Sequence, residues 1–380
     1  MNAVPGRPQT PGEVASLLGI NKDLSHRVVV ALRNKDPIAI AHQLPGAAPL
    51  RRFIRAGVAK GVPSNLATEA ENAVHNFDQL VREEAGDRSD FDAIISAWLP
   101  EARLRFEAVA KQSFFRGARH IKGIAANVVY HVIFFHPGEK PERLNTVQLR
   151  GYLGVRRVRL GATLKMGISS GNVPSDSSPQ TLDGRSVRDL RGVFLDDFCS
   201  GPPIELDVFG SGERLVYAIK WGDAVGMRSA RDIVMAEVRR GAPRAYRLPD
   251  DPRPRSGLTD AMVIPSRLYI CDLIMHHTVY PAWEPQVRVL ETGELGSADP
   301  NDDTRELDVL DVTERVEPLG MDIARFRAAE IPNYIELLGL VCETMSWDPK
   351  SFRGFRTRIE YPIYGSQVQY SFDVPIGPPT

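Results

Sequence analysis

The spacing of hydrophobic residues changes once along this chain, near position 124. Before that point apolar residues recur every three or four positions, which is the period of an amphipathic helix. Beyond it they form short apolar runs rich in β-branched and aromatic residues, as strands do. The pattern predicts an α+β fold, in which an N-terminal all-α region with a helix-turn-helix precedes a β-rich α+β domain.

The helical region is expected to contain a series of separate helices. Ser64 and Asp90 are expected to cap two of them, and Gly86 and Pro100 to interrupt the pattern. The expected helices cover residues 11–18, 22–33, 38–44, 49–61, 64–84, 90–99 and 101–122.

The β-rich region is expected to hold strands and two hairpins. One hairpin joins residues 204–208 to 214–219 through a GSGE turn, and residues 352–374 form another around Tyr364-Gly365-Ser366. The acidic stretch between residues 291 and 307 is expected to be a solvated loop. The other expected strands cover residues 125–136, 147–165, 262–279, 286–291 and 307–316.

Two further helices are expected among these strands, over residues 229–239 and 323–347, the second with a kink at Pro332. The pattern suggests three segments: a helix-turn-helix head, a helical connector or dimerisation region, and a ligand-sensing or assembly domain. These segments cover residues 1–62, 63–123 and 124–380.

Two short helices near the N-terminus are joined by a tight turn. Thr10 is expected to cap the first helix and to form a capping box with Glu13, and Pro11 suits its first position. Gly19 is expected to end this helix, because the turn needs a left-handed conformation that glycine adopts at little cost. Asn21 is expected to cap the next helix. This order predicts a helix-turn-helix.

The second of these helices has an apolar face and a polar face. Its spacing predicts that Leu24, Val28, Ala31 and Leu32 face inward. The residues expected on the outer side are Lys22, Ser25, His26 and Arg33, with Arg27 near its edge.

The stretch EVASLLGINKDLSHRVVVAL resembles the helix-turn-helix of IclR- and MarR-type winged-helix transcriptional regulators. The shared features are a small residue in the first helix (Ala15), a glycine four positions later (Gly19), an apolar residue after it (Ile20), and a polar then apolar second helix. The resemblance implies a DNA-binding head whose second helix enters the major groove. It also implies a wing of two short strands, whereas residues 38–61 predict two helices at that place.

In this interpretation the outer face of the second helix contacts double-stranded DNA. Ser25 and His26 would face base edges. The neighbouring polar and basic residues would contact phosphates or adjacent bases. They are Asn21, Lys22, Arg27, Arg33, Arg51, Arg52, Arg55 and Lys60.

Charge is unevenly distributed along the chain. The net charge of the 380 residues is −1 and the pI about 6.7, so a nucleic-acid contact needs a local basic patch. Residues 1–60 hold nine basic and three acidic residues, a net charge of +6. Residues 291–322 hold eleven acidic and two basic residues, a net charge of −9. This asymmetry is one mark of a nucleic-acid-binding end joined to another domain.

The cysteines suggest a reducing compartment. Cys199, Cys271 and Cys342 are widely spaced and match neither a zinc site nor a disulfide framework. The N-terminal residues lack the apolar core of a signal peptide, and no run reaches the ~18 apolar residues of a membrane helix. We therefore expect a cytoplasmic protein without a membrane partner.

A metal site could use one of the adjacent residues His276 and His277, which point to opposite faces if they lie on a strand. No metal-ligand spacing supports such a site, so histidines satisfied by hydrogen bonds are the favoured interpretation. The other candidate ligands are His131, His136, Asp272 and Glu284.

Other candidate chemistry is weaker. A catalytic site could combine two acids with a thiol, from Asp196, Asp197 and Cys199. No nucleophile motif surrounds these residues, so a position at the edge of a loop is the favoured interpretation. The GSGE segment at 210–213 lacks the Lys-Ser/Thr of a phosphate-binding loop and predicts a hairpin turn. Aromatic residues could line an apolar ligand pocket, although most such residues are core. They are Trp221, Trp283, Trp347, Tyr269, Tyr280, Tyr361, Tyr364 and Tyr370.

The sequence as a whole predicts a sequence-specific DNA-binding transcriptional regulator. We expect a homodimer that responds to a small-molecule effector, with no enzymatic activity and no cofactor. Two alternatives stay open: an interaction or assembly module that does not bind DNA, and a metal-dependent enzyme that uses His276 or His277.

Overall fold

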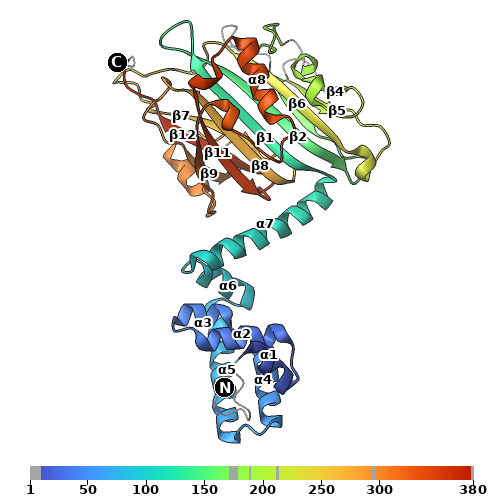
Figure 1. Cartoon of the computed structure of the whole chain (residues 1–380), viewed down its shortest axis with the longest axis vertical. Helices are drawn as coiled ribbons and strands as arrows, with labels where there is room; N and C mark the ends of the chain where they lie inside the picture. The colour runs from blue at the N-terminus through green and yellow to red at the C-terminus, as the bar shows by residue number, and fades with distance from the viewer. Residues whose placement is uncertain (1–9, 171–178, 188–189, 211–213, 293–295, 378–380) are drawn as a thin grey trace. The chain divides into compact units, whose positions relative to one another are not determined.

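The computed structural model describes residues 10–170, 179–187, 190–210, 214–292 and 296–377. The chain divides into two compact units, Met1–Val109 and Ala110–Thr380. Helices build the first unit, whereas sheets dominate the second (Figure 1). The expected α+β fold, with its all-α region first, is confirmed.

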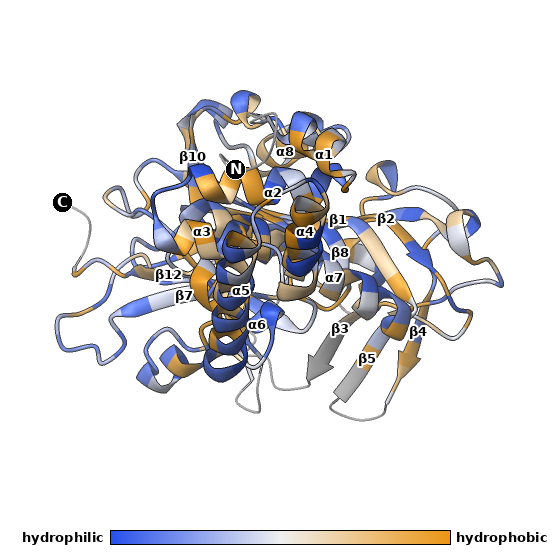
Figure 2. Cartoon of the chain, turned by 90° about the horizontal axis from the view of Figure 1, so that it is seen from below, coloured by the Kyte–Doolittle hydropathy of each residue, from blue (hydrophilic) through white to orange (hydrophobic). Residues whose placement is uncertain are grey.

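The first unit packs its helices around small apolar clusters. Val29 of the second helix joins Val14 and Leu18 in one cluster, whereas Val28 joins a cluster with Leu50 and Val74. The fifth helix is hydrophilic over much of its surface (Figure 2). The helices are α1 (Pro11–Leu18), α2 (Lys22–Arg33), α3 (Pro37–Gln43), α4 (Ala47–Ala59), α5 (Ser64–Glu84) and α6 (Arg88–Ser96).

The helices expected as a separate connector, residues 63–123, do not form a unit of their own. α5 packs along α4 inside the first unit, and α7 (Pro100–Lys122) runs from the first unit into the second. Near the end of α7, Phe115 packs against Tyr361, and the Gln112 amide donates to the Tyr361 hydroxyl at 3.2 Å.

A six-stranded sheet forms the centre of the second unit. Its strand order is β10-β11-β8-β1-β2-β6, and each pairing is antiparallel except that of β1 with β8. The strands are β1 (Ile124–Pro137), β2 (Leu144–Arg157), β6 (Arg231–Arg239), β8 (Ser266–His276), β10 (Val316–Met321) and β11 (Phe352–Glu360).

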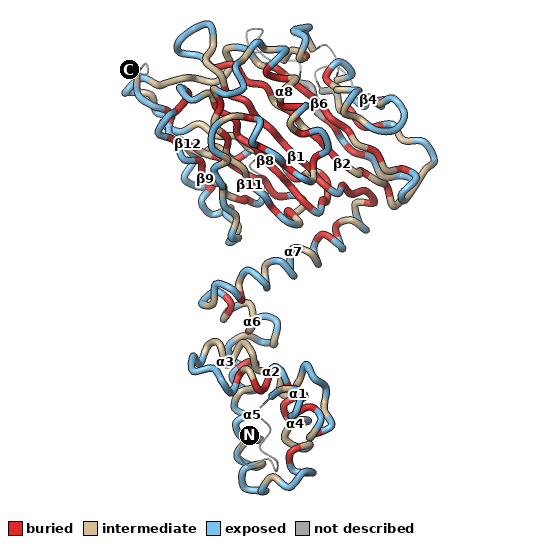
Figure 3. The backbone as a smooth tube through the Cα atoms, in the orientation of Figure 1, coloured by how far each residue is buried: buried red, intermediate tan, exposed pale blue. Residues whose placement is uncertain are grey.

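Both faces of this sheet are covered, and its central strands are buried along most of their length (Figure 3). Two three-stranded sheets, β7-β12-β9 and β3-β5-β4, share the apolar core on one face, and α8 (Tyr334–Met345) covers the other. The small sheets contain β3 (Lys165–Ser170), β4 (Leu206–Phe209), β5 (Arg214–Ile219), β7 (Arg255–Ala261), β9 (Gln286–Glu291) and β12 (Ser366–Asp373).

Short 3₁₀ helices occur in the connections of the second unit. They are η2 (Leu190–Val193), η3 (Asp196–Phe198), η4 (Gly226–Ser229), η5 (Asp303–Asp308), η6 (Ile323–Arg325) and η7 (Pro349–Ser351).

The expected helix over residues 229–239 is wrong, because this segment is strand β6. Since both faces of the central sheet are covered, β6 has a nearly continuous apolar run, which has no period of two to distinguish it from a helix. Its β-branched residues Ile233, Val234 and Val238 favour the strand.

The expected long helix over residues 323–347 is also wrong, because only α8 is α-helical there. Pro332 disfavours helical geometry in the residue before it, and Asn333 adopts a left-handed conformation with φ of 54°. The chain therefore enters α8 two residues after the proline rather than through a kink.

Residues 352–374 do not form the expected hairpin. β11 pairs with β8 and β10, whereas β12 pairs with β7 and β9. The Tyr364-Gly365-Ser366 segment instead carries the chain from the central sheet to a small sheet. The hairpin of β4 with β5 is confirmed, with Val208 opposite Tyr217, while its turn at 211–213 lies outside the described residues.

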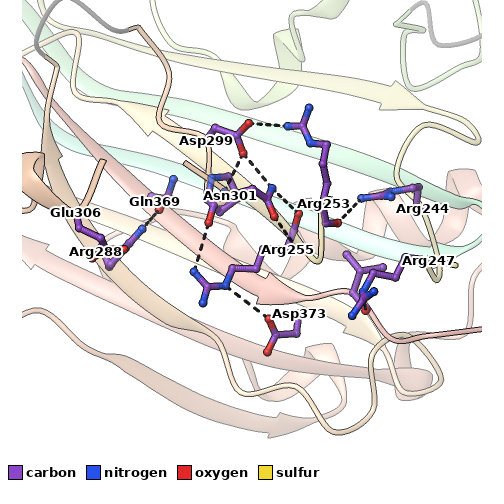
Figure 4. Close-up of polar contacts among 12 residues, drawn as sticks. Arg244, Arg247, Arg253, Arg255, Arg288, Asp299, Asn301, Glu306, Gln369 and Asp373 are labelled. Carbon is purple, nitrogen blue, oxygen red and sulfur yellow. Dashed lines mark hydrogen bonds and ion pairs between the residues drawn. The ribbon is translucent and has the colours of Figure 1, made fainter. Parts of the chain in front are cut away.

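The acidic segment is not simply a solvated loop, and residues 307–316 do not form the expected strand. Leu307 is exposed near the end of η5, whereas neighbouring Arg305 is buried. Asp299 accepts a hydrogen bond from Arg253 at 2.7 Å, and Glu306 pairs with Arg288 (Figure 4). These two acids thus neutralise Arg253, which lies just before β7, and Arg288 of β9.

Candidate functional site

The α1–turn–α2 corner is built as its sequence predicts. The Glu13 amide donates to Thr10 Oγ1 at 3.3 Å, and the Thr10 amide donates to Glu13 Oε2 at 3.2 Å, which completes the capping box. Gly19 has a left-handed φ of 64°. Asn21 Oδ1 accepts from the Asp23 amide at 2.6 Å and so caps α2. These local contacts fix the angle between the two helices.

The face of α2 that packs inward differs from the expected one. Val28 and Ala31 are buried as expected, but Leu32 is 59% exposed and Ser25 is fully buried. Ser25 Oγ donates to the Pro11 carbonyl at 2.6 Å, so its small side chain lets α1 approach α2 closely. The expected base contact of Ser25 is therefore wrong, because the hydroxyl is enclosed and already bonded.

The Arg27 side chain also forms hydrogen bonds within the first unit. Its guanidinium donates to the carbonyls of Gln43 and Leu44, at 3.1 and 3.0 Å, where α3 ends. Arg88 donates to the carbonyls of Ala41 and His42 in the same turn. The last carbonyls of a helix have no partner within it, so these two arginines hold α3 in place. The expected DNA contact of Arg27 conflicts with this role.

Lys22 and His26 remain on the exposed side of α2, one helical turn apart. Arg33 is exposed at the end of the same helix, and Asn21 is exposed at its start with its oxygen engaged in the cap. A helix turn with an exposed cation and an exposed imidazole can donate hydrogen bonds to base edges and phosphates.

The basic residues of α4 divide into two groups. Arg51 pairs with Glu71 and Asp78 of α5, at 3.7 and 3.6 Å, so its charge is partly neutralised. Arg52, Arg55 and Lys60 are exposed. Within the described part of the first unit no strand occurs, so α3 and α4 stand where a winged helix has its wing.

Three histidines of the second unit, His136, His276 and His277, form a cluster held by contacts between their rings and with Trp347. His136 stacks on Trp347 with ring centroids 4.5 Å apart, and the ring of His276 lies 5.0 Å from His136 and 4.3 Å from His277. Burial and the neighbouring His136 and His277 lower the pKa of His276 to about 4.

The other expected metal ligands do not join this cluster. His131 belongs to the opposite face of β1, and Asp272 is held by Arg356 through both oxygens. Among the described residues, no group of three or more His, Cys, Asp or Glu side chains is arranged to hold a metal ion.

Asp196, Asp197 and Cys199 lie at a 3₁₀ turn beside β6. Cys199 Sγ accepts a hydrogen bond from the Val234 amide at 3.3 Å, and burial raises the pKa of this thiol. A protonated thiol tied to a strand is a poor nucleophile, which agrees with the loop-edge interpretation.

The aromatic residues mostly belong to packed clusters. The guanidinium groups of Arg157 and Arg231 each lie 5.6 Å from the ring centroid of Trp221. Trp283 and Tyr280 pack against Phe372 in the core.

A buried carboxylate, Asp260 of β7, is not among the site residues that the sequence predicts. Arg150 lies 2.9 Å from one carboxylate oxygen, while the other accepts from the Tyr269 hydroxyl at 3.0 Å and lies 3.4 Å from His131 Nδ1. Burial alone would raise the pKa of Asp260, but Arg150 and His131 hold it well below its usual range. The available signal was a single acid within the mostly apolar residues 258–264.

Within the described residues, no helix has the length and apolarity needed to cross a membrane. No protein-family model, curated protein or solved structure matches this chain.

Proposed function

We propose that this protein is a sequence-specific DNA-binding transcriptional regulator, in which α2 enters the major groove. The observation that carries the proposal is the exposed turn of Lys22 and His26 on a capped two-helix corner. The local net charge of +6 in residues 1–60 supports it, since phosphate contacts supply most of the affinity for DNA.

The contacts differ from those of a winged helix. Lys22 and His26 reach base edges, and Arg33 reaches the backbone at the far end of α2. Arg52 and Arg55 on α4 contact phosphates. A homodimer follows from the proposal, because helix-turn-helix proteins commonly bind two half-sites. The second unit then holds the dimer or a small-molecule effector.

Selection from a random double-stranded DNA library, with the full chain and its variants, tests the proposal. His26→Ala should lose the sequence preference, whereas Arg52→Ala should weaken binding to all sequences and lower the salt slope by about one. Arg51→Ala is the matched control on the same helix, because Glu71 and Asp78 already engage that guanidinium.

Failure of the wild type to enrich any sequence would overturn the proposal, and so would binding that is indifferent to salt between ~50 and ~200 mM. Large assemblies that form without nucleic acid would then favour the assembly module.

A further inference from the structure

Three arginines of the second unit, Arg119, Arg156 and Arg267, lie at one end of the central sheet. Arg119 belongs to the last turn of α7, which leads through Gly123 into β1 (Figure 1). Arg156, near the end of β2, lies opposite Ala125 of β1. Arg267, at the start of β8, flanks β1 from its other side at almost the same level. We call these three residues the arginine cluster.

The arginine cluster has no counter-charge within the described residues. Arg156 donates to the Asn127 amide oxygen at 2.8 Å, which is a neutral acceptor. The Nε of Arg119 is buried and has no hydrogen-bond partner among the described residues. Burial, Arg119 and Arg267 together lower the pKa of Arg156, and no carboxylate lies close enough to raise it. The three guanidinium groups therefore repel one another, and an anion from outside the chain would relieve this repulsion.

The segments that carry the cluster are strongly basic. Residues 108–138 hold four Lys or Arg residues and residues 143–175 hold six, and neither range contains Asp or Glu. Arg116 is exposed one helical turn before Arg119. Arg159 is exposed as well, and its guanidinium donates to the Ile121 carbonyl at the end of α7. The positive charge thus continues beyond the cluster along α7 and β2.

The cluster is wider than one phosphate group. β1 lies between β2 and β8, so the backbones of Arg156 and Arg267 are two strand spacings apart, about 9.6 Å. Arg116 extends the basic surface by a further ~4.5 Å along α7. A DNA duplex carries one negative charge per ~1.7 Å of its axis. An extended polyanion therefore matches this surface better than a small anion does.

The exposed apolar residues of α7 lie on another side of the helix. Phe114 is 48% exposed and Ile121 is 81% exposed. Each is two positions from an arginine, Arg116 or Arg119, and residues two apart on an α-helix point about 200° apart. A flat bilayer would meet the apolar side chains and the arginines on opposite sides of α7. The backbone of a nucleic acid needs only the cations, so the arrangement favours nucleic acid over anionic lipid.

We propose that the arginine cluster contacts the phosphate backbone of double-stranded DNA. Each of its guanidinium groups can donate two parallel hydrogen bonds to one phosphate. Such contacts hold the protein on DNA and carry no sequence information. The cluster is separate from α2, so its contact is present whether or not α2 selects a sequence.

Fluorescence anisotropy of a labelled random-sequence duplex of about 20 bp, with the full chain between ~50 and ~200 mM salt, measures the contact. Arg119→Gln and Arg267→Gln should each lower the slope of log affinity against log salt by about 0.9. Each should also weaken binding roughly eightfold at ~0.1 M salt, because that slope acts over one decade below 1 M.

Arg325→Gln is the matched control, because it removes the same charge from the same unit. Arg325 is exposed on η6, and Asp322 just before η6 hydrogen-bonds to Phe352, which lies opposite the last residue of β8. It is therefore about 30 Å along β8 from Arg267, well beyond the Debye length. The salt slope of this variant should equal that of the wild type.

A Lys22→Ala/Arg52→Ala background separates the cluster from the contacts proposed for α2 and α4. In this background Arg119→Gln and Arg267→Gln should weaken the remaining binding by the same factor as in the wild type, because distant sites act additively. Cluster-dependent binding without any sequence preference would support the cluster and overturn the function proposed for α2.

The inference is overturned if Arg267→Gln, with an unchanged melting temperature, keeps the wild-type salt slope, even where His26→Ala shows that α2 selects a sequence. This exposed position decides the outcome if Arg119→Gln does not fold. A wild-type protein that binds no DNA overturns both proposals. Cluster-dependent binding to vesicles of phosphatidylcholine and phosphatidylserine, with DNA binding unaffected by the variants, would assign this surface to anionic lipid instead.

Discussion

Asp272 joins four elements of the second unit, and its removal should destabilise them together. It has no exposed surface, and Arg356 donates to its two oxygens from Nε at 2.7 Å and Nη2 at 2.6 Å. The Tyr334 hydroxyl of α8 donates to the same carboxylate. Arg356 also donates to the carbonyls of Phe326 and Arg327. One carboxylate thus links β8, β11, α8 and the segment before α8.

Asp272→Ala should cost about 3–5 kcal/mol of the free energy of unfolding. The substitution leaves the guanidinium of Arg356, which is only 13% exposed, without its counter-charge, and losing one member of a buried ion pair costs that much. Asp272→Asn keeps the shape and one acceptor for Tyr334, so its cost should be about 2–3 kcal/mol.

Urea unfolding measures both variants. Of the four tryptophans, only Trp98 lies in the first unit, so a Trp98→Phe background makes the fluorescence report on the second unit. Glu205→Ala is the control, because it removes an exposed ion pair with Lys220 and should leave the unfolding midpoint unchanged. A loss below about 1 kcal/mol for Asp272→Ala would show that the network does not hold α8 on the sheet.

The other predictions concern His276 and two glycines. Because the pKa of folded His276 is about 4, below the ~6.5 of an unfolded histidine, the unfolded chain binds the proton first as the pH falls. Stability should therefore drop between pH ~6.5 and ~4, and His276→Gln should show a smaller drop in urea midpoint. Gly151→Ala places a Cβ 2.0 Å from the buried Tyr130 ring and should cost about 2 kcal/mol or more, whereas Gly161→Ala meets nothing within 4 Å and should change the thermal midpoint little.

Features that depend on adjacent residues could be predicted from the sequence. The capping box of Thr10 with Glu13, the left-handed Gly19 and the Asn21 cap all appear where expected, because each involves residues within one helical turn. The confirmed β4–β5 hairpin likewise depends on a short connection.

Features that depend on distant partners could not be predicted in this way. The sequence predicts the polar Ser25 on the outer face of α2, yet the Pro11 carbonyl, 14 residues earlier, accepts a hydrogen bond from its hydroxyl inside the unit. Arg27 is likewise engaged by carbonyls at the end of α3. Asp260 lies between two sheets, and its partner Arg150 comes from a strand more than 100 residues earlier. Helical spacing carries no information about such partners.

The structure shows which of the unevenly distributed charges are paired and which are exposed. The negative charge of residues 291–322 is partly neutralised by neighbouring arginines, because Asp299 pairs with Arg253 and Asp308 pairs with the buried Arg305. In the described part of residues 1–60, Lys22 and Arg52 have no acidic partner of this kind and stay exposed. Residues 61–109 hold four basic and ten acidic residues, so the first unit also carries no net charge, and its exposed positive side chains are concentrated locally on α2 and α4. A polyanion would therefore be attracted to those two helices at short range, through their exposed basic side chains rather than through a field of the whole unit.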